Sequence, residues 1–228
     1  MSDYSGFEPY TPVQPVKVDL HVPVEYREPL AALREMGLET PKIEGGFLRD
    51  LFCGKAFKDI DMSVSTKTWR ACEMSIDDAA DLILKDWRFR ELKTEFMAPV
   101  KQAGDGYGYI MLRRRRLQCE FVTKAGNRLP LDITIFSEPV SPAEMSLNAD
   151  APINSAVIDL SGNVIADPDF EDHCKRQIYH LRTHGISAAL EGARRFKRIR
   201  DRAYPKMRFE APAKSVGLIA ACVARLAA

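Results

Sequence analysis

Two short segments decide the fold of this chain: Gly45-Gly46-Phe47-Leu48-Arg49-Asp50 and, shortly after it, Asp59-Ile60-Asp61. Adjacent glycines permit a tight turn, and bare backbone N–H groups at a helix start suit a phosphate. In an expected strand, Asp59 and Asp61 face one side together while Ile60 faces the opposite, buried side. Two neighbouring carboxylates repel each other, and a divalent cation between them relieves the repulsion. A phosphate-binding turn beside a magnesium site indicates nucleotide chemistry.

A third carboxylate lies on a later predicted strand. The segment Leu129 to Phe136 alternates apolar and polar residues, and Asp132 is one of its polar positions. A two-metal phosphoryl-transfer site needs three carboxylates, so Asp59, Asp61 and Asp132 are the expected catalytic and metal-binding residues. This requires the two strands to be neighbours in one sheet. Glu120, on the preceding strand, is the rival for the third position.

The composition is that of an ordinary globular protein with an uneven charge distribution. The 228 residues are 46% hydrophobic and 29% charged, with a net charge of +1. From Lys175 onward there are 13 Lys and Arg against 3 Asp and Glu, a local balance of +10. This basic third indicates an anionic partner such as RNA, DNA or a phosphorylated substrate, and a solvated helix face explains it equally well.

The cysteines and the apolar segments bear on localisation. Five cysteines without a C-x-x-C pair, and no apolar signal segment at the N-terminus, predict a reduced cytoplasmic environment. No apolar run approaches the roughly 20 residues that a membrane span needs, so no membrane partner is expected.

The chain is expected to divide into three parts. Residues 1–25 carry several prolines and predict an extended N-terminal arm. Residues 26–172 hold the glycine and carboxylate motifs and form the main domain, and residues 173–228 form a basic helical appendage. Within the main domain the patterns predict helices over 28–36, from 49 to 52 and over 76–84. Strands are predicted over 42–44, 58–64, 107–122, 129–136, 155–159 and 164–165.

The first motif resembles a known family. Gly45 to Gly54, followed by Lys58 to Asp61, looks like the head motif of class II CCA-adding enzymes and bacterial poly(A) polymerases. These enzymes belong to the DNA polymerase β nucleotidyltransferase superfamily. The resemblance implies an α+β nucleotidyltransferase head, with a small mixed β-sheet flanked by helices and a short helical C-terminal neck. It also implies that Gly45, Gly46 and Arg49 contact the incoming triphosphate, and that Asp59 and Asp61 hold magnesium.

A second segment, Asp150-Ala151-Pro152-Ile153-Asn154-Ser155, resembles the next motif of that family. Asp150 and Asn154 match it, whereas Asn148 and Ala149 replace its two arginines. The resemblance implies that Asp150 and Asn154 bind the nucleotide sugar and phosphates. The loss of two cations predicts weaker triphosphate binding, or transfer of that task to the run Arg113–Arg116.

The resemblance weakens in the predicted neck. Glu191 to Phe196 is similar to the family's neck helix, but the Glu-Asp-x-x-Arg template for base selection would fall on Gly185, Ile186 and Ala189. Base choice by that template is therefore not expected. The neck carries a dense basic helix with Phe196 and Ile199 on its apolar side. Its cations are Arg194, Arg195, Lys197, Arg198, Arg200 and Arg202.

The function expected from these residues and from the resemblance is a magnesium-dependent nucleotidyltransferase. It would move a nucleoside monophosphate from an NTP to a hydroxyl acceptor, with two Mg²⁺ ions as cofactors. An RNA 3′ end, bound through the basic helix, is the expected acceptor. The alternative is a non-catalytic nucleotide or RNA sensor on the same fold, favoured by the altered second motif.

Overall fold

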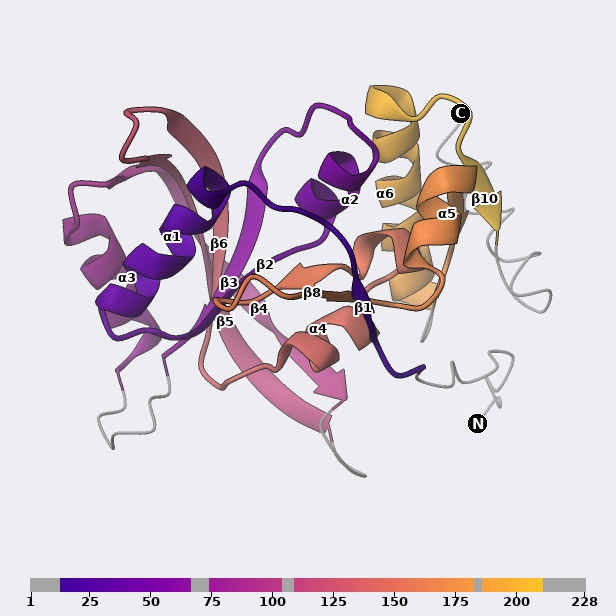
Figure 1. Cartoon of the computed structure of the whole chain (residues 1–228). Helices are drawn as coiled ribbons and strands as arrows, with labels where there is room; N and C mark the ends of the chain where they lie inside the picture. The colour runs from indigo at the N-terminus through magenta and orange to yellow at the C-terminus, as the bar shows by residue number, and fades with distance from the viewer. Residues whose placement is uncertain (1–12, 67–73, 104–108, 183–185, 211–228) are drawn as a thin grey trace, which may run out of the picture.

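An eight-stranded mixed sheet forms the centre of the computed structural model, which describes residues 13–66, 74–103, 109–182 and 186–210 (Figure 1). The strand order is β1-β8-β7-β2-β3-β6-β5-β4, and β3 and β6 are the parallel pair among otherwise antiparallel neighbours. The strands are β1 Val16–Val18, β2 Glu39–Glu44, β3 Ile60–Ser65, β4 Phe89–Ala103, β5 Tyr109–Val122, β6 Arg128–Phe136, β7 Val157–Ile158 and β8 Val164–Ala166. A separate two-stranded parallel sheet pairs β9 (Ile178–His180) with β10 (Arg208–Glu210).

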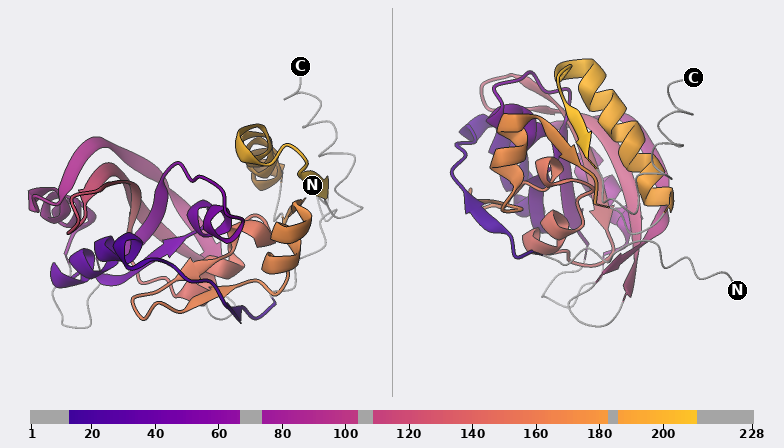
Figure 2. Two further views of the ribbon diagram at one scale, coloured as in Figure 1. Left: turned by 45° about the horizontal axis from the view of Figure 1, so that its top comes forward. Right: turned by 90° about the vertical axis from the view of Figure 1, so that its right-hand side faces the viewer.

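Six α-helices accompany the sheet within the described ranges. They are α1 Val24–Glu35, α2 Gly46–Phe52, α3 Ile76–Lys85, α4 Pro142–Leu147, α5 Phe170–Arg176 and α6 Ile186–Ala203, together with the short 3₁₀ helix η1 at Pro152–Asn154. Figure 1 shows α1 and α3 at one end of the molecule and α2, α5 and α6 toward the other, and the left view of Figure 2 shows the same division.

One face of the central sheet is the hydrophobic core. Ile43, Met62 and Ile133 are register partners on β2, β3 and β6, and all three are fully buried. Helix α3 packs against β4, β5 and β6 through an apolar side. Its start is capped by the Ser75 hydroxyl, which accepts a hydrogen bond from the Asp78 amide at 3.0 Å. The core therefore leaves the opposite face of β2, β3 and β6 free to carry polar side chains.

Helix α6 docks on the rest of the chain through aromatic rings. The centroids of Tyr179 and Phe196 lie 5.7 Å apart, and those of Phe196 and Phe209 lie 5.0 Å apart. Phe196 and Ile199 are both buried, which confirms that they form the apolar side of the basic helix. The two-stranded sheet β9–β10 holds two of these rings in place, so the neck is not purely helical as predicted.

The prediction of an α+β fold with a mixed sheet is confirmed, but the sheet is larger than the small one expected. Val16–Val18, predicted as part of an extended arm, forms β1 and pairs with β8. Strand β4 was not predicted, because its described start, Phe-Arg-Glu-Leu-Lys-Thr-Glu, carries charges at positions that break the alternation of a half-buried strand. Helix α4 was also missed. Residues 211–228 of the predicted appendage lie outside the described residues.

Within the described ranges, no helix combines the length and apolar character needed to cross a lipid bilayer.

Candidate active site

Three carboxylates form a row across the polar face of the sheet. Asp61 on β3 is the register partner of Asp132 on the parallel strand β6, and of Glu44 on the antiparallel strand β2. Side chains of partnered residues on adjacent strands point to the same face. The expected adjacency of the strands that carry Asp61 and Asp132 is therefore confirmed. Asp59 lies just before β3, and its charge is close enough to raise the pKa of Asp61.

The glycine turn abuts this row. Gly45 has a φ of +73°, a left-handed conformation that glycine adopts without strain, and it directly precedes α2. A Cβ placed on either Gly45 or Gly46 would lie 3.8 Å from Asp61 Oδ2. The Gly45 amide donates to the Ala156 carbonyl at 2.9 Å, so this N–H is already committed to the fold. The predicted phosphate turn and the predicted metal site are thus direct neighbours.

The row carries more negative charge than its surroundings balance. The pKa of Asp61 is raised to about 7, chiefly by burial and also by the charges of Asp59 and Asp132, against the opposing charges of Arg195 and Arg116. Burial and the charge of Asp61 likewise raise the pKa of Glu44 to about 7. Carboxylate oxygens are hard ligands of the kind that Mg²⁺ prefers. The chemistry of this donor set therefore fits magnesium.

Two of the three predicted metal ligands are held by cations of the chain itself. Asp132 is almost fully buried and accepts hydrogen bonds from Arg116 Nε at 2.6 and 2.8 Å. Asp59 pairs with Lys58 Nζ at 2.9 Å. Within the described residues, no group of three or more His, Cys, Asp or Glu side chains is already arranged around a common point. Binding of a metal by Asp59 and Asp132 would therefore exchange these ion pairs for the ion.

The structure separates the two candidates for the third carboxylate. Glu120 on β5 lies opposite Pro130, two register positions along β6 from Asp132, and forms an ion pair with Arg128 Nη1 at 3.2 Å. Asp132, in contrast, is the direct partner of Asp61. The geometry therefore favours Asp132.

The other predicted binding residues form one hydrogen-bonded chain. Arg49 on α2 donates to Asn154 Oδ1 at 2.7 Å, and Asn154 Nδ2 donates to Asp150 Oδ1 at 2.8 Å. Arg49 and Asn154 are buried, and Asp150 is partly exposed. The structure thus brings together three residues that were predicted from two separate motifs.

Both ends of this chain are anchored by residues from the C-terminal third. Asp150 accepts a hydrogen bond from Tyr179 Oη at 2.7 Å and lies 3.2 Å from Arg195 Nε. At the other end, Arg49 Nη2 lies 2.7 Å from Asp50 Oδ1. Asp50 in turn accepts hydrogen bonds from two residues of the C-terminal third, Arg202 Nη2 at 2.7 Å and Tyr204 Oη at 2.9 Å.

Sequence reasoning missed Glu44 as part of the site, although its position was readable. Glu44 directly precedes Gly45, and a strand ending there must point Glu44 to the face opposite Ile43. Arg116 was named only within a charge run, and Arg195 only within the basic helix. Their placement depends on strand register and on the docking of α6. Asn148 and Ala149 stand where the resembled motif has two arginines. In the structure, Arg116 and Arg195 are the arginines that lie near the carboxylates of the site.

Four cations of α6 face away from this network. They are Arg194, Lys197, Arg198 and Arg200, whose side chains are all more than two-fifths exposed. They lie near two carboxylates of the same helix: Arg194 and Arg198 near Glu191, and Lys197 and Arg200 near Asp201. This face keeps a positive balance.

Comparison with solved structures supports the fold. A tRNA-processing enzyme in its apo form shares 19% sequence identity with this chain, with a TM-score of 0.52 over 92% of this chain and 49% of that one. The Thermotoga maritima CCA-adding enzyme complexed with tRNA (17% identity, TM-score 0.47, 90% and 43% covered) is also similar. So is the Bacillus stearothermophilus CCA-adding enzyme in complex with CTP (16% identity, TM-score 0.48, 86% and 42% covered).

These similarities define the class of fold. The predicted resemblance to class II CCA-adding enzyme heads is confirmed in the fold, over about nine-tenths of the chain. At such low sequence identities the similarity concerns the fold alone, and it rests on the tRNA-processing enzyme, whose TM-score is 0.52. The chain spans about half the length of the structures that it matches. No protein-family model and no curated protein matches the chain.

Proposed function

We propose that this chain is a magnesium-dependent nucleotidyltransferase that moves a nucleoside monophosphate from an NTP to a hydroxyl acceptor and releases pyrophosphate. The observation that carries the proposal is the register pairing of Asp61 with Asp132 beside the turn at Gly45 and Gly46. Neighbouring carboxylates next to a glycine turn at a helix start are the parts from which a phosphoryl-transfer site is built.

The residues divide into two roles under this proposal. Asp59, Asp61 and Asp132 would hold two Mg²⁺ ions, which when bound would lower the pKa of the attacking hydroxyl and neutralise the triphosphate charge. Gly45, Gly46, Arg49, Asp150 and Asn154 are the proposed nucleotide-binding residues. Arg116 would leave Asp132 for the triphosphate once the carboxylate binds metal, and so replace a cation absent from the second motif.

The proposed acceptor is an RNA 3′ end. The exposed cations of α6 form a phosphate-binding surface on the same helix whose Arg195 reaches Asp150. Phosphate contacts of this kind orient a nucleic acid without reading its sequence. Since the base-selecting template is missing, we expect base preference to be broad.

The test is incorporation of each labelled NTP into total RNA in the presence of Mg²⁺. The wild-type chain should extend the RNA, and Asp61→Asn should lower the rate by about 100-fold or more, because it removes the central ligand of the row. Asp172→Asn, an exposed carboxylate on α5, is the matched control and should keep full activity. Undiminished incorporation by the Asp61→Asn chain would remove the carboxylate row from the reaction.

A nucleotide or RNA sensor is the second candidate function. Asp132 is held by two hydrogen bonds from Arg116, and Arg49 is only 2% exposed, so both residues are engaged inside the protein. Calorimetric titration of NTP with and without Mg²⁺, paired with a pyrophosphate assay, separates the two functions. Tight NTP binding without pyrophosphate release would favour the sensor.

A further inference from the structure

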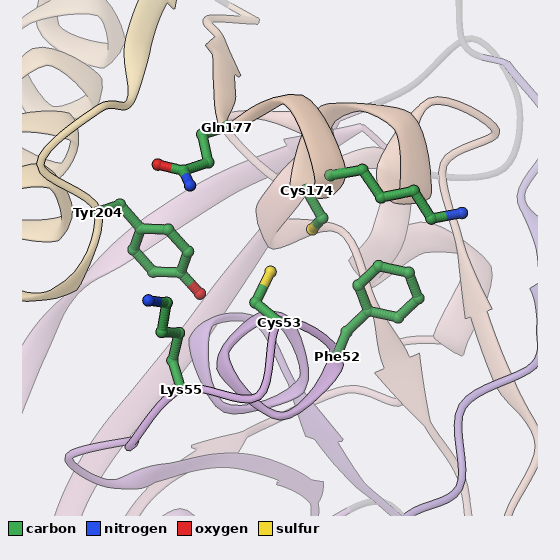
Figure 3. Close-up of a pocket in the computed structure, with 7 residues that line it drawn as sticks. Phe52, Cys53, Lys55, Cys174, Gln177 and Tyr204 are labelled. Atoms are coloured by element: carbon green, nitrogen blue, oxygen red, sulfur yellow. The ribbon is translucent and has the colours of Figure 1, made fainter.

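A pocket lies beside the C-terminal end of α2. It encloses about 190 Å³ between α2, α5 and the segment after α6. Figure 3 shows its lining, in which two sulfur atoms from different helices point toward one another. The lining residues are Phe52, Cys53, Lys55, Cys174, Lys175, Gln177 and Tyr204.

The two thiols of this pocket point toward one another (Figure 3). Cys53 directly follows α2 and is half-buried, whereas Cys174 lies on α5 and is buried. Both are free cysteines. Cys119, the third cysteine of the described residues, lies on β5 in the sheet core and has no part in this pair. The pocket therefore joins one accessible thiol and one sheltered thiol.

The surroundings make the two thiols chemically unequal. The pKa of Cys53 is lowered to about 7, chiefly by interaction with the Cys174 thiol and also by the Tyr204 hydroxyl and the Arg49 guanidinium, against the effect of burial. The pKa of Cys174 is raised, because it interacts with the Cys53 thiol and is buried. A low-pKa exposed thiol beside a protonated one is the arrangement of an attacking and a resolving cysteine.

We propose that Cys53 and Cys174 form a reversible dithiol–disulfide pair whose oxidant is a hydroperoxide that reaches Cys53 through the pocket. The Cys53 thiolate attacks one peroxide oxygen and becomes a sulfenic acid, while the O–O bond breaks. The other oxygen leaves as hydroxide or alkoxide and takes up the proton that the Cys53 thiol had released, so it departs as water or alcohol. The Cys174 sulfur then attacks the Cys53 sulfur. The hydroxide that leaves takes the Cys174 proton and departs as water, so two thiols and one peroxide yield one disulfide.

The disulfide would tie the end of α2 to α5. It joins residues far apart in the sequence, and closing a long loop stabilises a fold mainly by restricting the unfolded chain. Whether the Cys53–Cys174 disulfide forms does not depend on whether the carboxylate row is catalytically active. The inference is therefore independent of the proposed function.

The test uses the full chain with Cys72→Ser and Cys222→Ser, so that Cys53, Cys119 and Cys174 remain of the five cysteines. Stoichiometric hydrogen peroxide should reduce the free thiols from three to one, with a mass loss of two hydrogens and a peptide that links Cys53 to Cys174. The melting temperature should rise by roughly 5 °C, and dithiothreitol should reverse both changes.

Single variants in the same background identify the partners. Cys53→Ser and Cys174→Ser should each abolish the mass loss and the rise in melting temperature, whereas Cys119→Ser should leave both unchanged. Reduced-state melting curves establish that each variant is folded. A sulfinic acid on Cys53 with Cys174 still reduced would overturn the proposal, as would a disulfide that involves Cys119.

Discussion

Two sets of carboxylates, one on α2 and the other on the strands β2 and β3, differ in how their charge is balanced. Asp50 is 1% exposed and has three donors, on Arg49, Arg202 and Tyr204. Asp61 and Glu44 lie side by side on neighbouring strands, and within the described ranges neither accepts a hydrogen bond from a cationic side chain; the pKa of each is raised to about 7. The charge of Asp50 is neutralised by donors of the protein, so Asp50 stabilises the fold. The negative charge of Asp61 and Glu44 is not neutralised in this way, which favours binding of a cation.

The two sets also come from different levels of structure. The row of Glu44, Asp61 and Asp132 follows from strand register, which repeats a side-chain direction every second residue. The network around Asp50 depends on Arg202 and Tyr204, about 150 positions further along the chain. The carboxylate row is therefore defined by a local sequence pattern, whereas the network around Asp50 is defined by packing between distant segments.

The largest expected effect on stability comes from breaking the balanced set. Asp50→Ala leaves Arg49 buried without its carboxylate, and removal of one partner of a buried ion pair destabilises a protein by about 3–5 kcal/mol. Urea unfolding of the metal-free chain measures this loss. Asp172→Ala, which breaks only an exposed pair with Arg176, is the control and should change stability by less than about 0.5 kcal/mol. Equal losses in both variants would contradict the distinction.

The pH dependence of stability tests the unbalanced row. Because the pKa values of Asp61 and Glu44 are raised on folding, the folded state binds more protons than the unfolded state between pH of about 4 and 7. The stability of the metal-free protein should therefore fall as pH rises through this window and level off above it. Thermal melting across the pH range measures this.

The Asp61→Asn variant and added Mg²⁺ provide two controls for the pH-dependent melting experiment. Asp61→Asn should flatten the fall, since the main buried charge no longer forms. Mg²⁺ added above pH 7 should raise the melting temperature of the wild type and leave that of the variant unchanged. A wild-type melting temperature that is insensitive to both pH and Mg²⁺ would show that repulsion among the carboxylates of the row does not destabilise the fold.

Glu44→Gln should have a smaller effect of mixed sign. It removes one of the repelling charges, so the metal-free protein should gain about 1 kcal/mol, and the affinity for Mg²⁺ should fall by roughly 2- to 10-fold. Titration of Mg²⁺ followed by melting temperature measures both quantities. The matched control is Glu120→Gln, whose carboxylate pairs with Arg128 and lies outside the row. Identical behaviour of the two variants would place Glu44 outside the site.

The smallest effect is expected at Arg195. Its half-exposed ion pair with Asp150 contributes about 0.2–1 kcal/mol, so Arg195→Gln should destabilise the chain only slightly. Arg195 also lowers the pKa of Asp61, and its loss should move the end of the pH-dependent fall to higher pH. Arg194→Gln, which faces Glu191 instead, should shift neither. The pH profile of the melting temperature distinguishes the two arginines.

Part of the fold and the site could be predicted from sequence, because it rests on short-range patterns. The alternation in Leu131-Asp132-Ile133 fixes which side chains share a face of the sheet, and it correctly placed Asp132 on the face opposite its apolar neighbours. That Asp132 lies beside Asp61 depended on the two strands being neighbours, which the structure shows. Strand β4 escaped prediction, because an edge strand with many charges shows no regular alternation. Glu44 escaped notice for another reason: it was treated as the end of a strand, and its facing partner on β3 was not considered.

The sequence by itself determined the glycine turn, the carboxylates on alternating positions and the α+β class of the fold, since these depend on backbone conformation and on side-chain periodicity. Only the tertiary structure decided that Arg116 holds Asp132, that α6 sends Arg195 to Asp150 and Arg202 to Asp50, and that two distant cysteines meet. The physical reason is that ion pairs and thiol contacts act over a few ångströms in space, and spacing along the chain does not specify which distant segments pack together.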